Sequence, residues 1–187
     1  MSTIYMLGDS HTQALGPRLK TLYGDGFRFE AFPGYSTARA DAARKLSPSG
    51  AETILLSLGG NDFGDQSAAR HRLIDSLRAK NPTANIFWLG PFQSKDPAVD
   101  RRHQEQTHSQ RVQFSSAGVR WIDGRPLSAP LTHIADGTHF TPSSYSVLAE
   151  KIAEVAGTTT KTGLGIGFVA ALIGVGWWLL RKMQRAT

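Results

Sequence analysis

Short apolar segments alternate with longer amphipathic ones along the chain up to residue 156. Apolar runs of this length are typical of buried strands, whereas apolar residues three and four positions apart indicate helices. The predicted strands cover 4–7, 27–32, 53–58, 85–89 and 119–122. Because strands that alternate with helices form parallel sheets covered on both faces, the sequence predicts a three-layer α/β/α sandwich around a five-stranded parallel sheet.

The helical patterns lie between these strands. The predicted helices cover 12–22, 37–46, a segment that begins near Asp65, and 142–155. Leu22, Val147 and Val155 belong to the apolar stripes, so they are predicted to face inward. The polar segment 95–117 has little apolar periodicity, and two interpretations stay open for it: a thinly packed helix, or a flap over the functional site.

The chain contains no cysteine. Disulfide frameworks, thiolate metal sites and cysteine nucleophiles are therefore excluded. The net charge of +6 comes largely from the C-terminal end, because four of the 21 Lys and Arg residues lie at or after residue 161, whereas all 15 Asp and Glu residues precede it. No basic run interleaved with aromatic residues occurs in the body of the chain, so no nucleic-acid partner is predicted.

An apolar segment near the C-terminus, 163–180, has no charged or polar side chain among its 18 residues. As a helix it would be about 27 Å long, close to the thickness of a bilayer core. Trp177 and Trp178 lie near one end, as is typical at a membrane interface. We therefore expect a 1–156 domain, a polar linker at 157–162, a single transmembrane helix at 163–180 and a basic tail at 181–187; a buried core helix is the alternative.

The same apolar segment raises two further questions. Gly163 and Gly167 form a GxxxG pair, which predicts self-association of the membrane helix. The first ten residues lack a basic region followed by an apolar core, so no signal peptide is expected. The charge flanking 163–180 and the absence of that signal favour opposite orientations, so the orientation of this anchor is left open.

Two short polar blocks contain the residues of a nucleophilic site. Gly-Asp-Ser at 8–10 directly follows the first strand, and Asp136 and His139 lie just before the last helix. A neutral imidazole can take a proton from a serine hydroxyl, and a carboxylate can hold that imidazole in the useful tautomer. The alternatives are that Ser10 only caps a helix and that Asp136 and His139 belong to an ordinary surface loop.

Two further blocks follow the second and third strands. Parallel sheets bind ligands beyond the carboxyl ends of their strands, which is where Gly34 and Asn61 lie. The Gly34 N–H and the Asn61 amide are predicted to stabilise an oxyanion, although both residue types also favour turns. Asp9 and Asp62 are interpreted as carboxylates that fix loops.

A metal site is the main chemical alternative. His11, His133 and His139 are the candidate ligands, but their spacing matches no known pattern of metal ligation. We therefore predict neither a metal nor another cofactor.

The order of these blocks resembles that of the GDSL or SGNH hydrolase family. The resemblance covers about residues 3–156, and the segment from His139 to Tyr145 is similar to the final block of the family. It implies a flavodoxin-like fold in which Ser10 is the nucleophile, His139 the general base and Asp136 its partner. It also implies an oxyanion hole made by the N–H groups of Ser10 and Gly34 and by the Asn61 side chain.

Two hypotheses of function follow from these patterns. The first is a membrane-anchored serine esterase acting on small acyl esters, such as acetyl groups of carbohydrate or peptidoglycan, or on short-chain lipid esters. The compact domain leaves few residues for a deep acyl-chain pocket, so long-chain lipase activity is not expected. The second hypothesis is a structural or binding protein of an envelope or virion membrane, built on a hydrolase scaffold.

Overall fold

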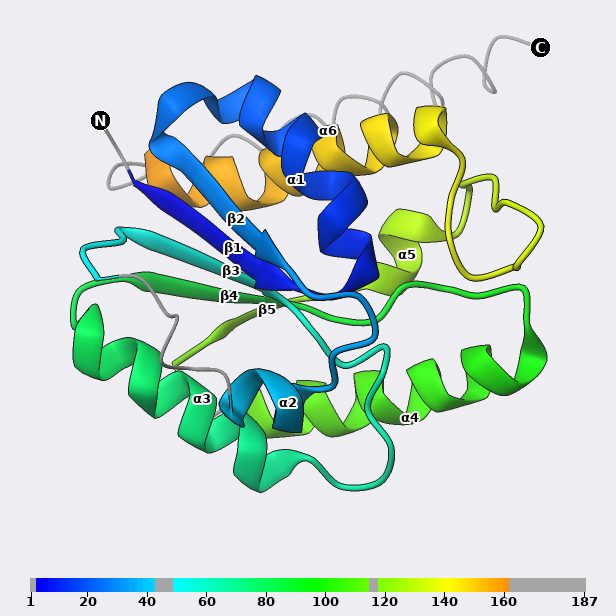
Figure 1. The fold of residues 1–187 in the computed structure, drawn as a ribbon, viewed down its shortest axis with the longest axis horizontal. Coiled ribbons are helices and arrows are strands. Elements are labelled where there is room, and N and C mark those ends of the chain that lie inside the picture. The colour runs from blue at the N-terminus through cyan, green and yellow to red at the C-terminus, as the bar shows by residue number, and fades with distance from the viewer. Residues whose placement is uncertain (1–2, 43–48, 115–117, 162–187) are drawn as a thin grey trace, which may run out of the picture. The chain divides into compact units, whose positions relative to one another are not determined.

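A computed structural model describes residues 3–42, 49–114 and 118–161. Its centre is a sheet of five parallel strands in the order β2-β1-β3-β4-β5 (Figure 1). The strands are β1 (Ile4–Gly8), β2 (Phe27–Ala31), β3 (Thr53–Ser57), β4 (Asn85–Leu89) and β5 (Arg120–Ile122). The predicted five-stranded parallel sheet is therefore confirmed, and each predicted strand lies within two residues of the observed one.

The strand order reverses at β1, which is where a sheet of this type binds ligands. Gly8 at the end of β1 pairs with Ala31 on one side and with Ser57 on the other. Three strands thus end at the same level, and the loops that follow them begin side by side. This register brings together the segments after β1, β2 and β3, in which the sequence placed its candidate residues.

Helices cover both faces of the sheet, as predicted for a three-layer sandwich. They are α1 (Ser10–Tyr23), a short 3₁₀ turn η1 (Gly24–Gly26), α2 (Thr37–Ala42), α3 (Ser67–Lys80), α4 (Pro97–Phe114), α5 (Gly124–Ser128) and α6 (Pro142–Lys161). Figure 1 shows α1 and α5 on one side of the sheet and α2, α3 and α4 on the other. The start of α6 lies on the α1 side, where Leu148 and Ile152 join the core.

The side chains of the strands alternate between two hydrophobic cores. On β1, Met6 is buried among α1 and α6 residues, whereas Tyr5 and Leu7 are buried with residues of α3 and α4. Side chains of successive strand residues point to opposite faces, so an apolar run such as that of β1 buries both of its sides. The core packing therefore follows directly from the continuous apolar runs in the sequence.

Three side chains that we predicted to face inward are exposed. Leu22 is 49% exposed, Val147 43% and Val155 39%. On α6 the buried residues include Ser144, Tyr145, Leu148, Ala149 and Ile152, so the buried face is rotated away from Val147 relative to the apolar stripe of the sequence. Leu22 lies in the last turn of α1, beyond its last buried residue, Leu19. The inward assignment of Leu22, Val147 and Val155 is therefore wrong.

Residues Pro97–Phe114 of the polar segment form α4, which favours the helix interpretation over a flap, and residues 115–117 lie outside the described residues. Its buried residues are His103, Gln106, Gln110 and Phe114, at spacings of three and four. The buried residues of α4 thus recur with the spacing of a helix, but most of them are polar. This explains why apolar periodicity did not reveal the helix.

Helix α6 continues to Lys161, into the segment predicted to be a linker. Residues 157–161 are therefore helical, and Glu154 begins a second compact unit that includes the end of this helix. Among the residues that the structure describes, no helix combines the length and apolar character needed to cross a bilayer. The predicted transmembrane helix, its Gly163 and Gly167 pair and the basic tail lie outside the described residues.

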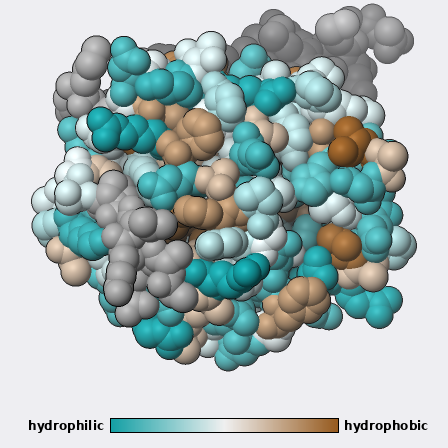
Figure 2. Space-filling model, viewed as in Figure 1, coloured by the Kyte–Doolittle hydropathy of each residue, from teal (hydrophilic) through white to brown (hydrophobic). Residues whose placement is uncertain are grey.

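The face of the molecule drawn in Figure 2 shows apolar residues in small areas separated by polar ones. Large apolar side chains that are exposed in the described part of the chain come from several elements, and only Val147 and Val155 share one, α6. They are Leu22, Phe63, Val112, Ile134, Val147 and Val155. Phe63 is the most exposed of them, at 69%.

Candidate active site

A chain of hydrogen bonds joins Ser10, His139 and Asp136. Ser10 is the first residue of α1, and the other two lie in the loop before α6. The Oγ atom of Ser10 is 2.8 Å from Nε2 of His139, and Nδ1 of His139 is 2.7 Å from Oδ2 of Asp136. The structure thus brings together three residues that are up to 129 positions apart in the sequence.

The surroundings of Asp136 determine the tautomer of His139. The second carboxylate oxygen of Asp136 accepts the backbone N–H groups of Thr138 and His139, both at 2.9 Å. Desolvation acts to raise the pKa of Asp136, but the hydrogen bonds from His139 and Thr138 outweigh it and lower the pKa to about 2. An ionised carboxylate only accepts hydrogen bonds, so Nδ1 of His139 carries the proton. In the neutral ring, Nε2 then has a lone pair that faces the Ser10 hydroxyl.

Helix α1 is capped by Asp9 and not by Ser10. The Asp9 carboxylate accepts the N–H of His11 at 3.0 Å. Ser10 therefore does not serve as the helix cap, and its hydroxyl is available to His139. The N–H of Ser10 belongs to the first turn of α1, where backbone N–H groups have no partner within the helix and can bind a negatively charged oxygen.

Asp9 is almost fully buried beside this site. Its second oxygen accepts a hydrogen bond at 3.3 Å from the Asn61 side chain. Burial raises the pKa of Asp9 to about 7, against the lowering effect of the His11 N–H. Asp9 thus connects the start of α1 to the loop after β3, in agreement with its interpretation as a loop-fixing carboxylate.

Asn61 extends from the loop after β3 into the same site. Its amide nitrogen donates to Asp9 and, at 3.3 Å, to the carbonyl of Tyr35. The next residue, Asp62, is fully buried and accepts the backbone N–H of Thr37 at 2.6 Å and its hydroxyl at 2.8 Å. Asp62 thereby caps α2 and fixes the loop that presents Asn61.

Gly34 follows β2 in a turn. Its φ angle of 74° is in the left-handed region that favours glycine. A side chain at this position would have no neighbour within 4 Å, so close packing does not require the small residue. Gly34 is also absent from the lining of the cavity described next, and its part in an oxyanion hole stays a prediction.

A cavity of about 320 Å³ opens at the Ser10 hydroxyl. It is lined by Asp9, Ser10, His11, Gly60, Asn61, Val99, Arg102, His103, Asp136, Thr138 and His139. Cavities that bind small molecules begin at about this volume. The space therefore suits a small substrate group rather than a long acyl chain.

Three of the lining residues come from α4 and were not predicted: Val99, Arg102 and His103. His103 lies with Nδ1 2.7 Å from the carbonyl of Phe92 and Nε2 3.1 Å from that of Gly60. Burial lowers the pKa of His103, while both carbonyls act to raise it. In the sequence, nothing except its position in a polar segment pointed to His103 as a residue of the site.

His11 packs against the imidazole of His139 from within the core. The two ring centroids are 5.1 Å apart, and Nδ1 of His11 is 2.9 Å from the Tyr145 hydroxyl. Burial is the largest cause that lowers the pKa of His11 to about 3, so its ring is neutral beside His139. A neutral ring supports the position of His139 without repelling a charged imidazolium.

The three histidines of the metal alternative face different partners. His11 contacts Tyr145, His139 contacts Ser10, and Nε2 of His133 is 3.0 Å from the carbonyl of Gln93. Among the described residues, no group of three or more His, Cys, Asp or Glu side chains is arranged to hold a metal ion.

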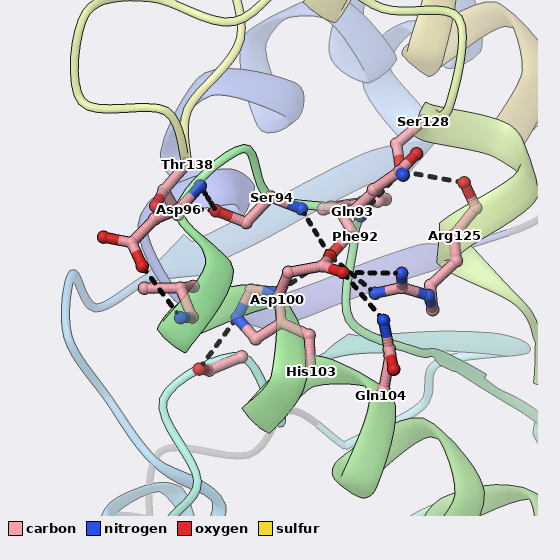
Figure 3. A network of polar contacts seen from close by, with 12 residues as sticks. Phe92, Gln93, Ser94, Asp96, Asp100, His103, Gln104, Arg125, Ser128 and Thr138 are labelled. Carbon is pink, nitrogen blue, oxygen red and sulfur yellow. Dashed lines mark hydrogen bonds and ion pairs between the residues drawn. The ribbon is translucent and has the colours of Figure 1, made fainter.

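A polar network fixes the loop that holds Asp136 and His139 (Figure 3). The Ser94 hydroxyl donates to the carbonyl of Gly137 at 3.0 Å, and the Ser94 N–H donates to Asp100 at 2.9 Å. Asp100 in turn accepts two hydrogen bonds from Arg125, at 2.8 and 3.0 Å. The loop after β4, the start of α4 and α5 thus form one support for the candidate site.

Replacing Arg125 by Gln is expected to destabilise the protein by about 1–2 kcal/mol at neutral pH. The side-chain hydrogen bonds from Arg125 are the largest cause that lowers the pKa of Asp100, from 3.8 to about 2. The ion pair therefore stabilises the protein fully at pH values above the pKa that Asp100 has in the unfolded chain. This stabilisation is lost as the pH falls through the lower pKa that Asp100 has in the folded protein. Denaturant unfolding at several pH values should show the difference between wild type and R125Q shrinking between about pH 4 and 2; a difference that does not change with pH would contradict this cause.

Comparison with known proteins identifies structural relatives. No family model matches the sequence, and no curated protein matches it. A carbohydrate acetylesterase from Sinorhizobium meliloti matches with a TM-score of 0.63 and 13% identity, over 85% of this chain and 100% of that one. The C-terminal catalytic domain of peptidoglycan O-acetyltransferase A from Streptococcus pneumoniae matches with a TM-score of 0.67 and 14% identity, over 85% and 94%. A member of the lipolytic G-D-S-L family from Veillonella parvula matches with a TM-score of 0.63 and 16% identity, over 83% and 98%.

The chain shares its fold with these proteins. At identities below 20% the likeness concerns the arrangement of strands and helices, and it extends over nearly the whole of each relative. The strand order β2-β1-β3-β4-β5 is the flavodoxin-like order that the sequence resemblance implied.

Proposed function

We propose that this chain is a serine esterase of the GDSL or SGNH type that hydrolyses small acyl esters. The observation that carries the proposal is the hydrogen-bonded series of Ser10, His139 and Asp136 at the edge of one cavity. The sequence resemblance and the fold shared with an acetylesterase and an acetyltransferase domain support the same reaction class.

The reaction would proceed in two steps through an acyl-enzyme. Ser10 Oγ forms a bond to the ester carbonyl carbon while its proton passes to Nε2 of His139. The bond from carbon to the alcohol oxygen then breaks, and His139 returns the proton to that oxygen. Water enters, gives one proton to His139 and forms a bond to the acyl carbon. The bond between that carbon and Ser10 Oγ then breaks, His139 returns the proton to Oγ, and the acid is released.

Acetyl-type esters of carbohydrate or peptidoglycan, or short-chain lipid esters, are the substrates that we infer. The cavity of about 320 Å³ supports small groups. Chromogenic esters of acetate, butyrate and a long-chain acid test this directly: turnover should be highest for the acetyl or butyryl ester. A preference for the long chain would contradict the inferred substrate class, and no turnover of any ester would favour a binding role.

Asn61→Ala is expected to reduce kcat by about 10²- to 10³-fold, because one donor to the oxyanion is lost. The Asn61 amide lines the cavity, and its two N–H groups donate to Asp9 and Tyr35 at 3.3 Å. One of these long hydrogen bonds would be exchanged for a bond to the oxyanion when it forms. Steady-state kinetics on the acetyl ester measure the effect, with Asn85→Ala at the exposed start of β4 as the control. A kcat within about threefold of wild type would exclude Asn61 from this role.

We further propose that residues 163–180 anchor the enzyme to a bilayer, with self-association through Gly163 and Gly167. The proposal rests on the uncharged apolar sequence and the basic residues that follow it. Membrane flotation of the full chain and of a chain ending at residue 161 tests it. Equal recovery of both in the soluble fraction would contradict an anchor.

A further inference from the structure

The cavity beside Ser10 has a cationic side chain that the proposed chemistry does not use. Arg102 lies on α4, one helical turn after Val99, and both side chains line the cavity. Neither the hydrogen-bonded triad nor the predicted oxyanion donors contact Arg102 in any recorded interaction. Its position therefore needs another explanation.

Arg102 is held in place without a carboxylate partner among the residues that the structure describes. Its guanidinium lies over the ring of Phe63, with Cζ 4.5 Å from the ring centroid. Its Nε is buried and has no hydrogen-bond partner in the described part of the chain. By contrast, the guanidinium groups of Arg72 and Arg125 lie 2.8 Å from carboxylate oxygens.

A cation in this arrangement is prepared to bind an anion. The contact with the Phe63 ring restrains the guanidinium, so less side-chain freedom is lost when a ligand binds. Because Nε is buried, a ligand in the cavity would meet the terminal nitrogens of the guanidinium, and a planar carboxylate can accept two hydrogen bonds from a guanidinium fork. Asp136, the acidic side chain nearest to His139, already accepts three hydrogen bonds.

We propose that Arg102 binds a carboxylate on the alcohol part of the ester, so that the substrates are small acyl esters of acidic alcohols, such as acidic sugars. This inference rests on the proposed function. An acetyl-type group has no ionisable atom, and therefore the charge that Arg102 meets must belong to the alcohol. The volume of the cavity and its opening at Ser10 allow one small substrate to reach both residues.

Two matched esters test the proposal: 4-acetoxybenzoate, which carries a carboxylate on the alcohol, and its neutral methyl ester. Arg102→Gln is expected to lower the ratio of kcat/KM for the charged ester to that for the neutral ester by about 10- to 100-fold, mainly through KM. Arg102→Lys, which keeps the charge and loses the fork, should lie between Arg102→Gln and wild type. The control is Arg101→Gln, an exposed arginine on the same helix, which should leave the ratio within about twofold.

An unchanged ratio in Arg102→Gln would overturn the inference, even if both rates fell together. Calorimetric titration with the product 4-hydroxybenzoate separates this result from a failure of the proposed function. If wild type hydrolyses neither ester, the esterase proposal fails. An anion site is still supported in that case if wild type binds 4-hydroxybenzoate and Arg102→Gln weakens this binding at least tenfold. If wild type and Arg102→Gln bind the product equally, no such site exists.

Discussion

Ser10→Ala is expected to reduce the turnover of an acetyl ester by at least about 10³-fold while leaving the fold intact. The variant removes the one oxygen that faces Nε2 of His139. Helix α1 keeps its cap, because Asp9 and not Ser10 accepts the N–H of His11. Kinetics on purified protein, together with thermal unfolding, separate a loss of chemistry from a loss of structure.

The matched control for this variant is Ser143→Ala. Ser143 also lies in the first turn of a helix, α6, but it is exposed and does not line the cavity. Its removal should leave turnover within about twofold of wild type. Full activity in Ser10→Ala would exclude an acyl-enzyme on this residue and with it the proposed mechanism.

Arg70→Ala is expected to destabilise the protein by about 3–5 kcal/mol, because it breaks a buried charge network. Arg70 on α3 is fully buried, with a nitrogen 3.6 Å from the carboxylate of Asp62. It donates to Gln113 at 2.6 Å, Ser109 at 2.7 Å and Gln106 at 3.2 Å, all on α4. Without Arg70, the Asp62 carboxylate stays buried with no opposite charge, and α4 loses its polar contacts with α3.

Urea unfolding of Arg70→Ala measures this loss, with Arg101→Ala as the control because Arg101 is an exposed arginine on α4. The control should change the free energy of unfolding by less than about 0.5 kcal/mol. A loss below about 1 kcal/mol in Arg70→Ala would show that the network contributes little to stability. The support that we assign to Asp62 and its loop would then be overestimated.

The sequence alone could predict that residues far apart in the chain meet at one site. The reason is that the predicted parallel strands end at the same edge of the sheet. Gly8, Ala31 and Ser57 end in register, so residues shortly after them share one edge of the sheet. Apolar runs identify such strands reliably when both faces are buried, as in β1 and β3. The short blocks after those strands then indicate which side chains meet there.

The contribution of α4 could not be predicted in the same way. Its buried positions are occupied by His103, Gln106 and Gln110, whose polar atoms contact carbonyl groups of other segments: Phe92, Gly60, Gly64 and Leu58. Such partners are set by the tertiary structure, and a hydrophobicity pattern contains no information about them. For the same reason, Arg102 emerged as a cavity residue only from the structure.

The central claim, that Ser10 is the nucleophile, is tested most directly by covalent labelling. The full chain is treated with a fluorophosphonate, which reacts with an activated serine, and its peptides are analysed by mass spectrometry. We predict a single adduct on Ser10, its loss in Ser10→Ala and much slower labelling in His139→Ala. An adduct on a different residue, or equal labelling of Ser10 when His139 is replaced, would contradict the account.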